Sequence, residues 1–81
     1  MCLAVPARLV ELDDRFQGRV DAQGNRLPVN CVMVPDAMVG DWLLVHAGFA
    51  IQRVSEEVAR QTWDLLDELE RRVEEDAHAN T

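Results

Sequence analysis

Five short apolar runs with turn-forming residues between them fill the first 54 residues, and this pattern constrains the fold more than any other feature. From Leu3 to Leu9 apolar residues recur with a period of two, which is typical of a β-strand. The alternation then shifts phase at Val10, which predicts a bulge or a bend. Pro6 cannot donate a ladder hydrogen bond, so this strand belongs at a sheet edge or beside the bulge.

The second and third runs are joined by a recognisable hairpin signal. The two aspartates at residues 13–14 predict a turn after the first strand, and the Gln-Gly-Asn sequence at 23–25 contains residues that accept positive φ. A strand from Leu27 to Met33 follows in strict alternation. Cys31 falls on the apolar face of that strand, which indicates a buried, unreactive core thiol.

The last two runs complete the predicted barrel. Residues 35–41 predict a loop, and residues 42–47 are apolar on both faces, which predicts the most buried strand. Gly48 interrupts this run, and residues 49–54 form the fifth strand. Five short strands with tight turns predict a small OB-like β-barrel over residues 2–54, because closure removes the exposed edges of so small a sheet.

One amphipathic helix is predicted after the barrel. Ser55 is a good N-cap, and Glu56 and Glu57 occupy the first turn, where the helix dipole favours negative charge. The residues of one face recur at three- and four-residue steps: Val58, Thr62, Leu65, Leu66, Leu69 and Val73. We expect the helix over residues 55–76, a single domain over 1–76 and a flexible tail over 77–81. Leu66 and Leu69 are expected to pack on the barrel or on a partner.

Charge and hydropathy exclude several classes of protein. The net charge is −7, of which −6 lies in residues 55–81, and no lysine is present. A nucleic-acid partner needs a basic stripe that this chain lacks. No basic leader or apolar run approaching 18 residues occurs, so we expect neither a secretory signal nor a transmembrane helix. Two cysteines without a secretory signal indicate a reducing, cytoplasmic location.

Cys2 is the residue with the most reactive predicted chemistry. Once Met1 is removed, its thiol lies beside a free α-amine, whose positive charge lowers the pKa of a neighbouring thiol. A terminal thiolate is a nucleophile or a ligand for soft metals. The alternative interpretation is a small apolar residue that opens the first strand.

His46 is the second candidate, at the end of the fourth predicted strand. It is either a metal ligand or a hydrogen-bonded structural residue. Cys2 and His46 alone do not make a closed zinc site, and Cys31 is expected to point into the core. No nucleotide loop, paired cysteine motif or nucleophile elbow is present, so no enzyme mechanism assembles from these residues. An incomplete site of two donors indicates a carrier that shares its ligand with another protein.

Two segments carry a family resemblance. Residues 1–6, Met-Cys-Leu-Ala-Val-Pro, and residues 40–50, Gly-Asp-Trp-Leu-Leu-Val-His-Ala-Gly-Phe-Ala, together resemble the HypC/HybG/HupF family of accessory chaperones for [NiFe]-hydrogenase maturation. The resemblance covers essentially residues 1–70. Either motif alone is weak, whereas the two at these positions in a chain of this length are highly specific. Ala7 departs from the Gly that often follows Pro in the family, but this change removes no ligand.

The resemblance implies a function and a set of residues. It implies an OB-like barrel with a C-terminal helix, and removal of Met1 so that Cys2 binds the Fe(CN)2CO precursor of the hydrogenase active site. That cargo is shared with a HypD-type iron–sulfur scaffold protein and is delivered to the hydrogenase large-subunit precursor. The family histidine maps onto His46, a further candidate iron ligand. The residues expected to contact partners are Cys2, Pro6, His46, Gly48, Phe49, Leu66 and Leu69.

Two other functional classes remain as alternatives. In the first, the chain is a metal-free docking module that only recognises the large-subunit precursor. In the second, the barrel is an OB-fold nucleic-acid binder, which requires aromatic platforms and a basic groove. Trp42 and Phe49 are too few for such platforms, and the charge has the wrong sign. Alone, the chain is expected to be a monomer or a weak homo-oligomer.

Overall fold

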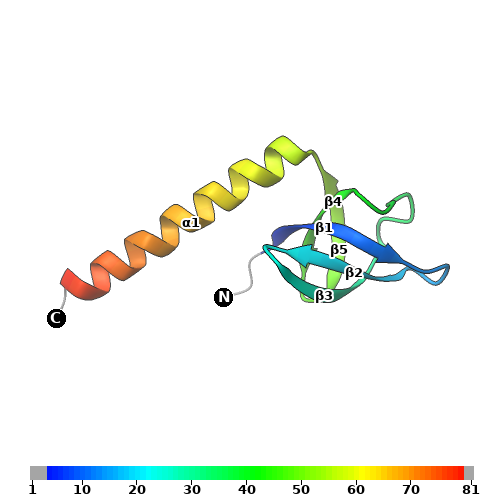
Figure 1. The fold of residues 1–81 in the computed structure, drawn as a ribbon, viewed down its shortest axis with the longest axis horizontal. Helices are drawn as coiled ribbons and strands as arrows, with labels where there is room; N and C mark the ends of the chain where they lie inside the picture. The colour runs from blue at the N-terminus through cyan, green and yellow to red at the C-terminus, as the bar shows by residue number, and fades with distance from the viewer. Residues whose placement is uncertain (1–3, 80–81) are drawn as a thin grey trace.

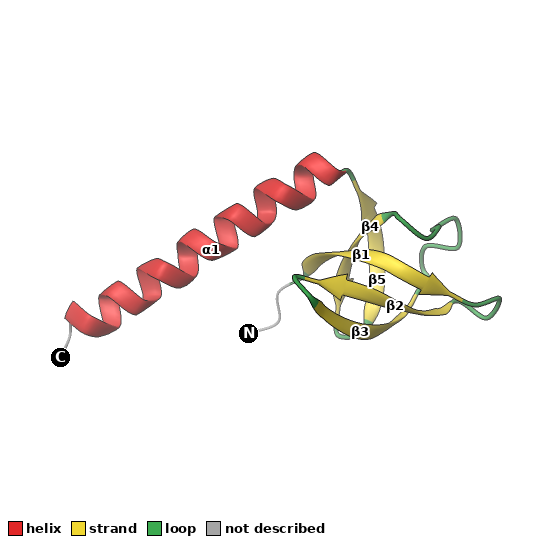
Figure 2. Ribbon diagram, in the orientation of Figure 1, coloured by secondary structure: helices red, strands yellow, loops and turns green. Residues whose placement is uncertain are grey.

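The computed structural model describes residues 4–79 of the chain, with side chains as far as Val73. Figures 1 and 2 show five strands followed by a single helix. The elements are β1 (Val5–Leu12), β2 (Gln17–Ala22), β3 (Asn25–Asn30), β4 (Trp42–His46), β5 (Phe49–Val54) and α1 (Glu56–Ala79). The predicted architecture, a five-stranded barrel with one C-terminal helix, is confirmed.

The strands close into a barrel in the order β1-β2-β3-β5-β4, with β4 pairing back onto β1. All neighbours are antiparallel except β3 and β5, which meet in parallel where Asn30 lies opposite Phe49. The Asn30 N–H donates to the Gly48 carbonyl at 2.8 Å at the same place. The β4–β5 turn therefore completes the closure of the barrel.

The predicted irregularity at Val10 is a β-bulge. The register between β1 and β2 shifts between Leu9 and Glu11. At the bulge the backbone of Leu9 turns to the loop before β4: its N–H donates to the Asp41 carbonyl, and its carbonyl accepts the Gly40 N–H, both at 2.8 Å. The bulge thus fastens the 40–41 segment to the middle of β1.

Two tight turns contain consecutive residues with positive φ, as hairpins with right-handed strand twist require. Gln23 and Gly24 (φ 51° and 88°) join β2 to β3, and Ala47 and Gly48 (φ 52° and 84°) join β4 to β5. The Asp21 carboxylate accepts the Gly24 N–H at 2.8 Å and supports the first turn. The hairpin predicted at residues 23–25 is therefore confirmed.

The core fills the barrel interior with small and medium apolar side chains. Its buried members are Ala7, Leu9, Val20, Val29, Cys31, Ala37, Leu43 and Ala50. Cys31 has no exposed surface, as its position in the alternation predicted. Burial raises the pKa of the Cys31 thiol, because the core disfavours the thiolate.

Two strand predictions were wrong in detail. The expected strand from Leu27 to Met33 ends at Asn30. The Cys31 N–H still donates to the Phe16 carbonyl at 2.7 Å, in register with the β2–β3 ladder, but Phe16 has a positive φ of 63° and the Cys31 carbonyl accepts the Val34 N–H in a turn. A turn follows, and Met33 is 62% exposed. β4 is not the most buried strand: only Leu43 is fully buried on it, and its other residues are half-buried.

The helix begins as predicted and extends further. The Val58 N–H donates to the Ser55 hydroxyl at 3.1 Å, so Ser55 is the N-cap, and Glu56 and Glu57 lie in the first turn. α1 continues to Ala79, three residues beyond the expected end. It runs well past the barrel (Figure 1), and the molecule measures 51 × 22 × 20 Å. No helix within the described residues is long and apolar enough to cross a membrane.

Candidate functional site

Three of the predicted partner-binding residues gather around the β4–β5 turn. His46 ends β4, Gly48 lies in the turn, and Phe49 begins β5 opposite His46. Val5, the first residue of β1, pairs with Val45 next to His46. The chain therefore enters β1 beside this turn, and the two segments of the family motif meet at one end of the barrel.

The His46 imidazole is half-buried at this end, and Phe49 is 40% exposed. No side-chain hydrogen bond to His46 forms within residues 4–73, and no buried polar atom there lacks a partner. The imidazole is therefore not held as a hydrogen-bonded core residue. An accessible imidazole nitrogen is available to a ligand or to a partner.

Pro6 is buried, whereas Ala4 and Val5, the other described residues of the opening motif, are half-buried. Its side chain is less than 2% exposed, and its carbonyl accepts the Trp63 indole N–H at 2.8 Å. This bond joins α1 to β1 across 57 positions of sequence. Pro6 thus fixes the helix against the strand that follows Cys2, and its predicted contact with a partner stays a prediction.

Cys2 lies outside the described residues. The other thiol, Cys31, is enclosed in the core, and burial raises its pKa. It is therefore not available as a metal ligand at the surface. In the part of the chain that the structure describes, no three His, Cys, Asp or Glu side chains cluster as a metal site requires. Of the two donors predicted from the sequence, His46 lies among the described residues, and the role of Cys2 stays a prediction.

Leu66 and Leu69, the helix residues predicted to bind a partner, lie on the apolar face of α1 but differ in their exposure. Ala59 is fully buried and Leu66 is half-buried, in the part of α1 that packs against β1. Leu65 and Leu69 are 56% and 48% exposed. The structure thus separates Leu66, which contributes to packing, from Leu69, whose apolar surface stays open.

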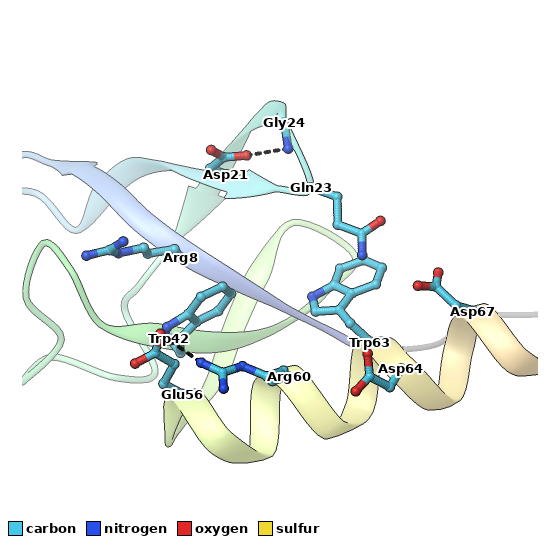
Figure 3. Close-up of a pocket in the computed structure, with 10 residues that line it drawn as sticks. All are labelled: Arg8, Asp21, Gln23, Gly24, Trp42, Glu56, Arg60, Trp63, Asp64 and Asp67. Carbon is cyan, nitrogen blue, oxygen red and sulfur yellow. Dashed lines mark hydrogen bonds and ion pairs between the residues drawn. The ribbon is translucent and has the colours of Figure 1, made fainter.

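Sequence reasoning did not find a groove of about 390 Å³ between α1 and the barrel, shown in Figure 3. Two indoles, from Trp42 of β4 and Trp63 of α1, line it together with charged residues of α1, β1 and β2. In the sequence, only the position of Trp63 next to the apolar face of the predicted helix pointed to this groove. The two walls of the groove are far apart in the sequence, and they come together only because the helix packs against the barrel.

Comparison with known proteins decides the family. The model of the HupF/HypC family matches residues 1–66, which is most of the chain. This protein belongs to the HupF/HypC family. The predicted resemblance is confirmed, and the match includes both the opening motif and the barrel residues around His46.

Individual relatives support the same conclusion. This chain is 49% identical to the hydrogenase maturation factor HypC of Cupriavidus necator over 71 residues, which cover 88% of this chain and 79% of the relative. It is 42% identical to HypC of Azotobacter chroococcum over 69 residues, covering 85% and 82%. HypC of Escherichia coli K12 is 35% identical over 75 residues, with coverage of 85% and 82%. These matches agree with the prediction of a maturation factor rather than an enzyme.

Proposed function

We propose that this HupF/HypC-family protein is a [NiFe]-hydrogenase maturation chaperone that carries the Fe(CN)2CO precursor. In this proposal it binds the cargo together with a HypD-type iron–sulfur scaffold protein and delivers it, in the cytoplasm, to the hydrogenase large-subunit precursor. The observation that carries the proposal is the family match over residues 1–66, since it includes Cys2 and His46 in one motif set. Relatives that share this span are named hydrogenase maturation factors.

The donor chemistry supports Cys2 as the residue that holds the cargo. Cyanide and carbonyl leave low-spin iron soft enough to prefer thiolate, and a thiol beside the α-amine ionises readily. Val5, the first residue of β1, pairs with Val45, the neighbour of His46. This pairing supports the proposal that His46 supplies a second donor to the same iron.

The small number of donors suits a carrier. Four protein ligands would close the coordination sphere and retain the metal, as structural zinc sites do. Two donors leave positions for the scaffold that supplies the iron and for the protein that receives it.

Infrared spectroscopy of the anaerobically purified complex with the scaffold partner tests the proposal. Cyanide and carbonyl bands are expected in the wild type and are expected to vanish in Cys2→Ala. Cys31→Ala is the matched control, because it removes the other thiol, which is buried, and should retain the bands.

Bands of equal strength in an intact Cys2→Ala complex would leave the iron on the partner. That result would support the second candidate function, a metal-free docking module. This alternative is favoured by one observation, the exposed apolar residues of α1, which could recognise a precursor protein without a metal.

Docking through the helix has its own test. Leu69→Asp is expected to reduce partner binding at least tenfold with little change in melting temperature, since burying a charge in an apolar interface is costly and Leu69 is 48% exposed. Leu66→Asp should lower both binding and stability, because Leu66 is half-buried. Val39→Asp on the β3–β4 loop, where Val39 is 60% exposed, is the control for an added surface charge.

A further inference from the structure

The groove between α1 and the barrel has two halves of different character. Figure 3 shows Arg8, Trp42, Glu56 and Arg60 at one end, and Trp63, Asp64 and Asp67 at the other. At the first end Arg60 pairs with Glu56 at 3.5 Å. At the second end neither Asp64 nor Asp67 is joined by a dashed line to another residue drawn in Figure 3.

The two carboxylates at the Trp63 end are exposed and have no charged partner among the described side chains. Asp64 and Asp67 form no ion pair and no side-chain hydrogen bond with any residue between 4 and 73. Asp21, the other groove carboxylate, is already engaged with the Gly24 N–H. Asp64 and Asp67 therefore differ from the other acids of the groove, whose partners lie within the chain.

The indole beside these carboxylates is held in place. Trp63 donates its N–H to the Pro6 carbonyl at 2.8 Å, so the ring cannot rotate away without losing that bond. Its half-buried π-face lines the groove. Tryptophan is the aromatic side chain that attracts cations most strongly, and a fixed ring presents that face without further ordering.

We propose that the Trp63 end of the groove binds an arginine side chain of a partner protein, with the guanidinium stacked on the indole and paired with Asp64 and Asp67. Arginine is favoured over lysine because its planar group stacks on aromatic faces and forms forked hydrogen bonds to carboxylates. The proposal rests on the proposed function only in that docking requires a partner, and it names one recognition contact in that docking.

Other occupants fit this end of the groove less well. A hard metal ion takes six or more oxygen ligands, whereas this end supplies two carboxylates and an apolar wall. A nucleic acid would be repelled by residues 55–81, which carry a net charge of −6. A basic protein segment gains from the same charge.

The test uses the two indole N–H signals of the isolated ¹⁵N-labelled chain, which has two tryptophans. Trp42→Phe assigns them. The probe is acetyl-Gly-Arg-Gly-amide, and acetyl-Gly-citrulline-Gly-amide has the same shape without the charge. We expect saturable shifts of the Trp63 signal, with affinity roughly fivefold or more greater for the arginine peptide than for the citrulline peptide.

A matched pair of charge-neutralising variants completes the test. Asp64→Asn with Asp67→Asn should abolish the preference for arginine. Glu57→Gln with Glu70→Gln removes the same charge from exposed residues of the same helix that do not line the groove, and should preserve the preference. Equal shifts with both peptides, shifts that do not saturate, or equal losses in the two double variants would overturn the proposal.

This experiment contains no iron and no scaffold protein. A negative result would therefore leave the infrared test of Cys2 unaffected. Conversely, infrared bands that persist without Cys2 would overturn the carrier proposal and leave the arginine contact in place.

Discussion

The barrel and the helix use apolar residues in opposite ways. In the barrel, Leu9, Val20 and Leu43 have no exposed surface, and the strands close on one another without a free edge. Between Glu56 and Val73 of α1 only Ala59 is fully buried, and the large apolar residues exposed there are Val58, Leu65, Leu69 and Val73. The comparison indicates that the barrel supplies the stability of the fold, while the helix leaves much of its apolar surface exposed.

The division within α1 follows from helical geometry. At 100° per residue, Ala59, Trp63 and Leu66 lie on one side of the apolar face, and Leu65 and Leu69 lie on the other. The first side packs against β1, and Trp63 fastens it through the Pro6 carbonyl. The second side continues along the part of α1 that extends beyond the barrel (Figure 1).

The largest loss of stability is expected when a core side chain of the barrel is truncated. Leu43→Ala should lower the free energy of unfolding by about 2–5 kcal/mol, because it leaves a cavity in a fully buried site. Urea denaturation followed by circular dichroism measures the change. A loss below about 1 kcal/mol would show that the barrel is not the stabilising unit.

Alkaline pH should weaken the barrel through Cys31. Burial raises the pKa of its thiol in the folded state, whereas the thiol of the unfolded chain has a pKa of about 8.5. Between these two pKa values the unfolded chain releases a proton that the folded chain retains, so stability is intact below about pH 8.5 and falls as pH rises toward the folded pKa. The slope can reach about 1.4 kcal/mol per pH unit.

Because the chain has neither lysine nor tyrosine, the Cys2 thiol and the α-amine are the other groups that titrate in this range, and the comparison with Cys31→Ala separates Cys31 from them. Urea denaturation from pH 8 to 10.5 is compared for the wild type and Cys31→Ala. The variant should show a flatter dependence on pH. Identical slopes would assign the effect to another group.

Removing the hydrogen bond that links the helix to the barrel is expected to have an intermediate effect on stability. Trp63→Phe retains an aromatic ring but removes the donor to the Pro6 carbonyl, which should cost about 1 kcal/mol. Denaturation reports the loss, and the remaining indole of Trp42 reports the state of the groove by fluorescence. Unchanged stability would mean that the helix is held by its apolar contacts alone.

The smallest effect is expected on the open side of the helix. Leu65→Ala makes the same chemical change as Leu43→Ala, but Leu65 is 56% exposed, and alanine is a good helix former. The free energy of unfolding should change by less than about 0.5 kcal/mol in the same urea experiment. A loss comparable to that of Leu43→Ala would show that the exposed side is part of the core.

Local sequence patterns determined the elements of this protein. Alternation with a period of two marked the strands, the phase shift marked the bulge at Val10, and Ser55 marked the start of the helix. Each depends on residues only a few positions apart. Cys2 and His46 could also be selected from the sequence, because two short motifs at these positions identify the HupF/HypC family, which the comparison confirmed.

The tertiary structure alone decided how these elements meet. β3 ends at Asn30, where its partner strand begins at Gln17 after the positive φ of Phe16 and the Cys31 carbonyl accepts the Val34 N–H in a turn. Trp63 reaches Pro6 across 57 residues and thereby forms the groove with Trp42. Such contacts depend on the closure of the barrel and the angle of the helix, and no periodicity within a single segment encodes them.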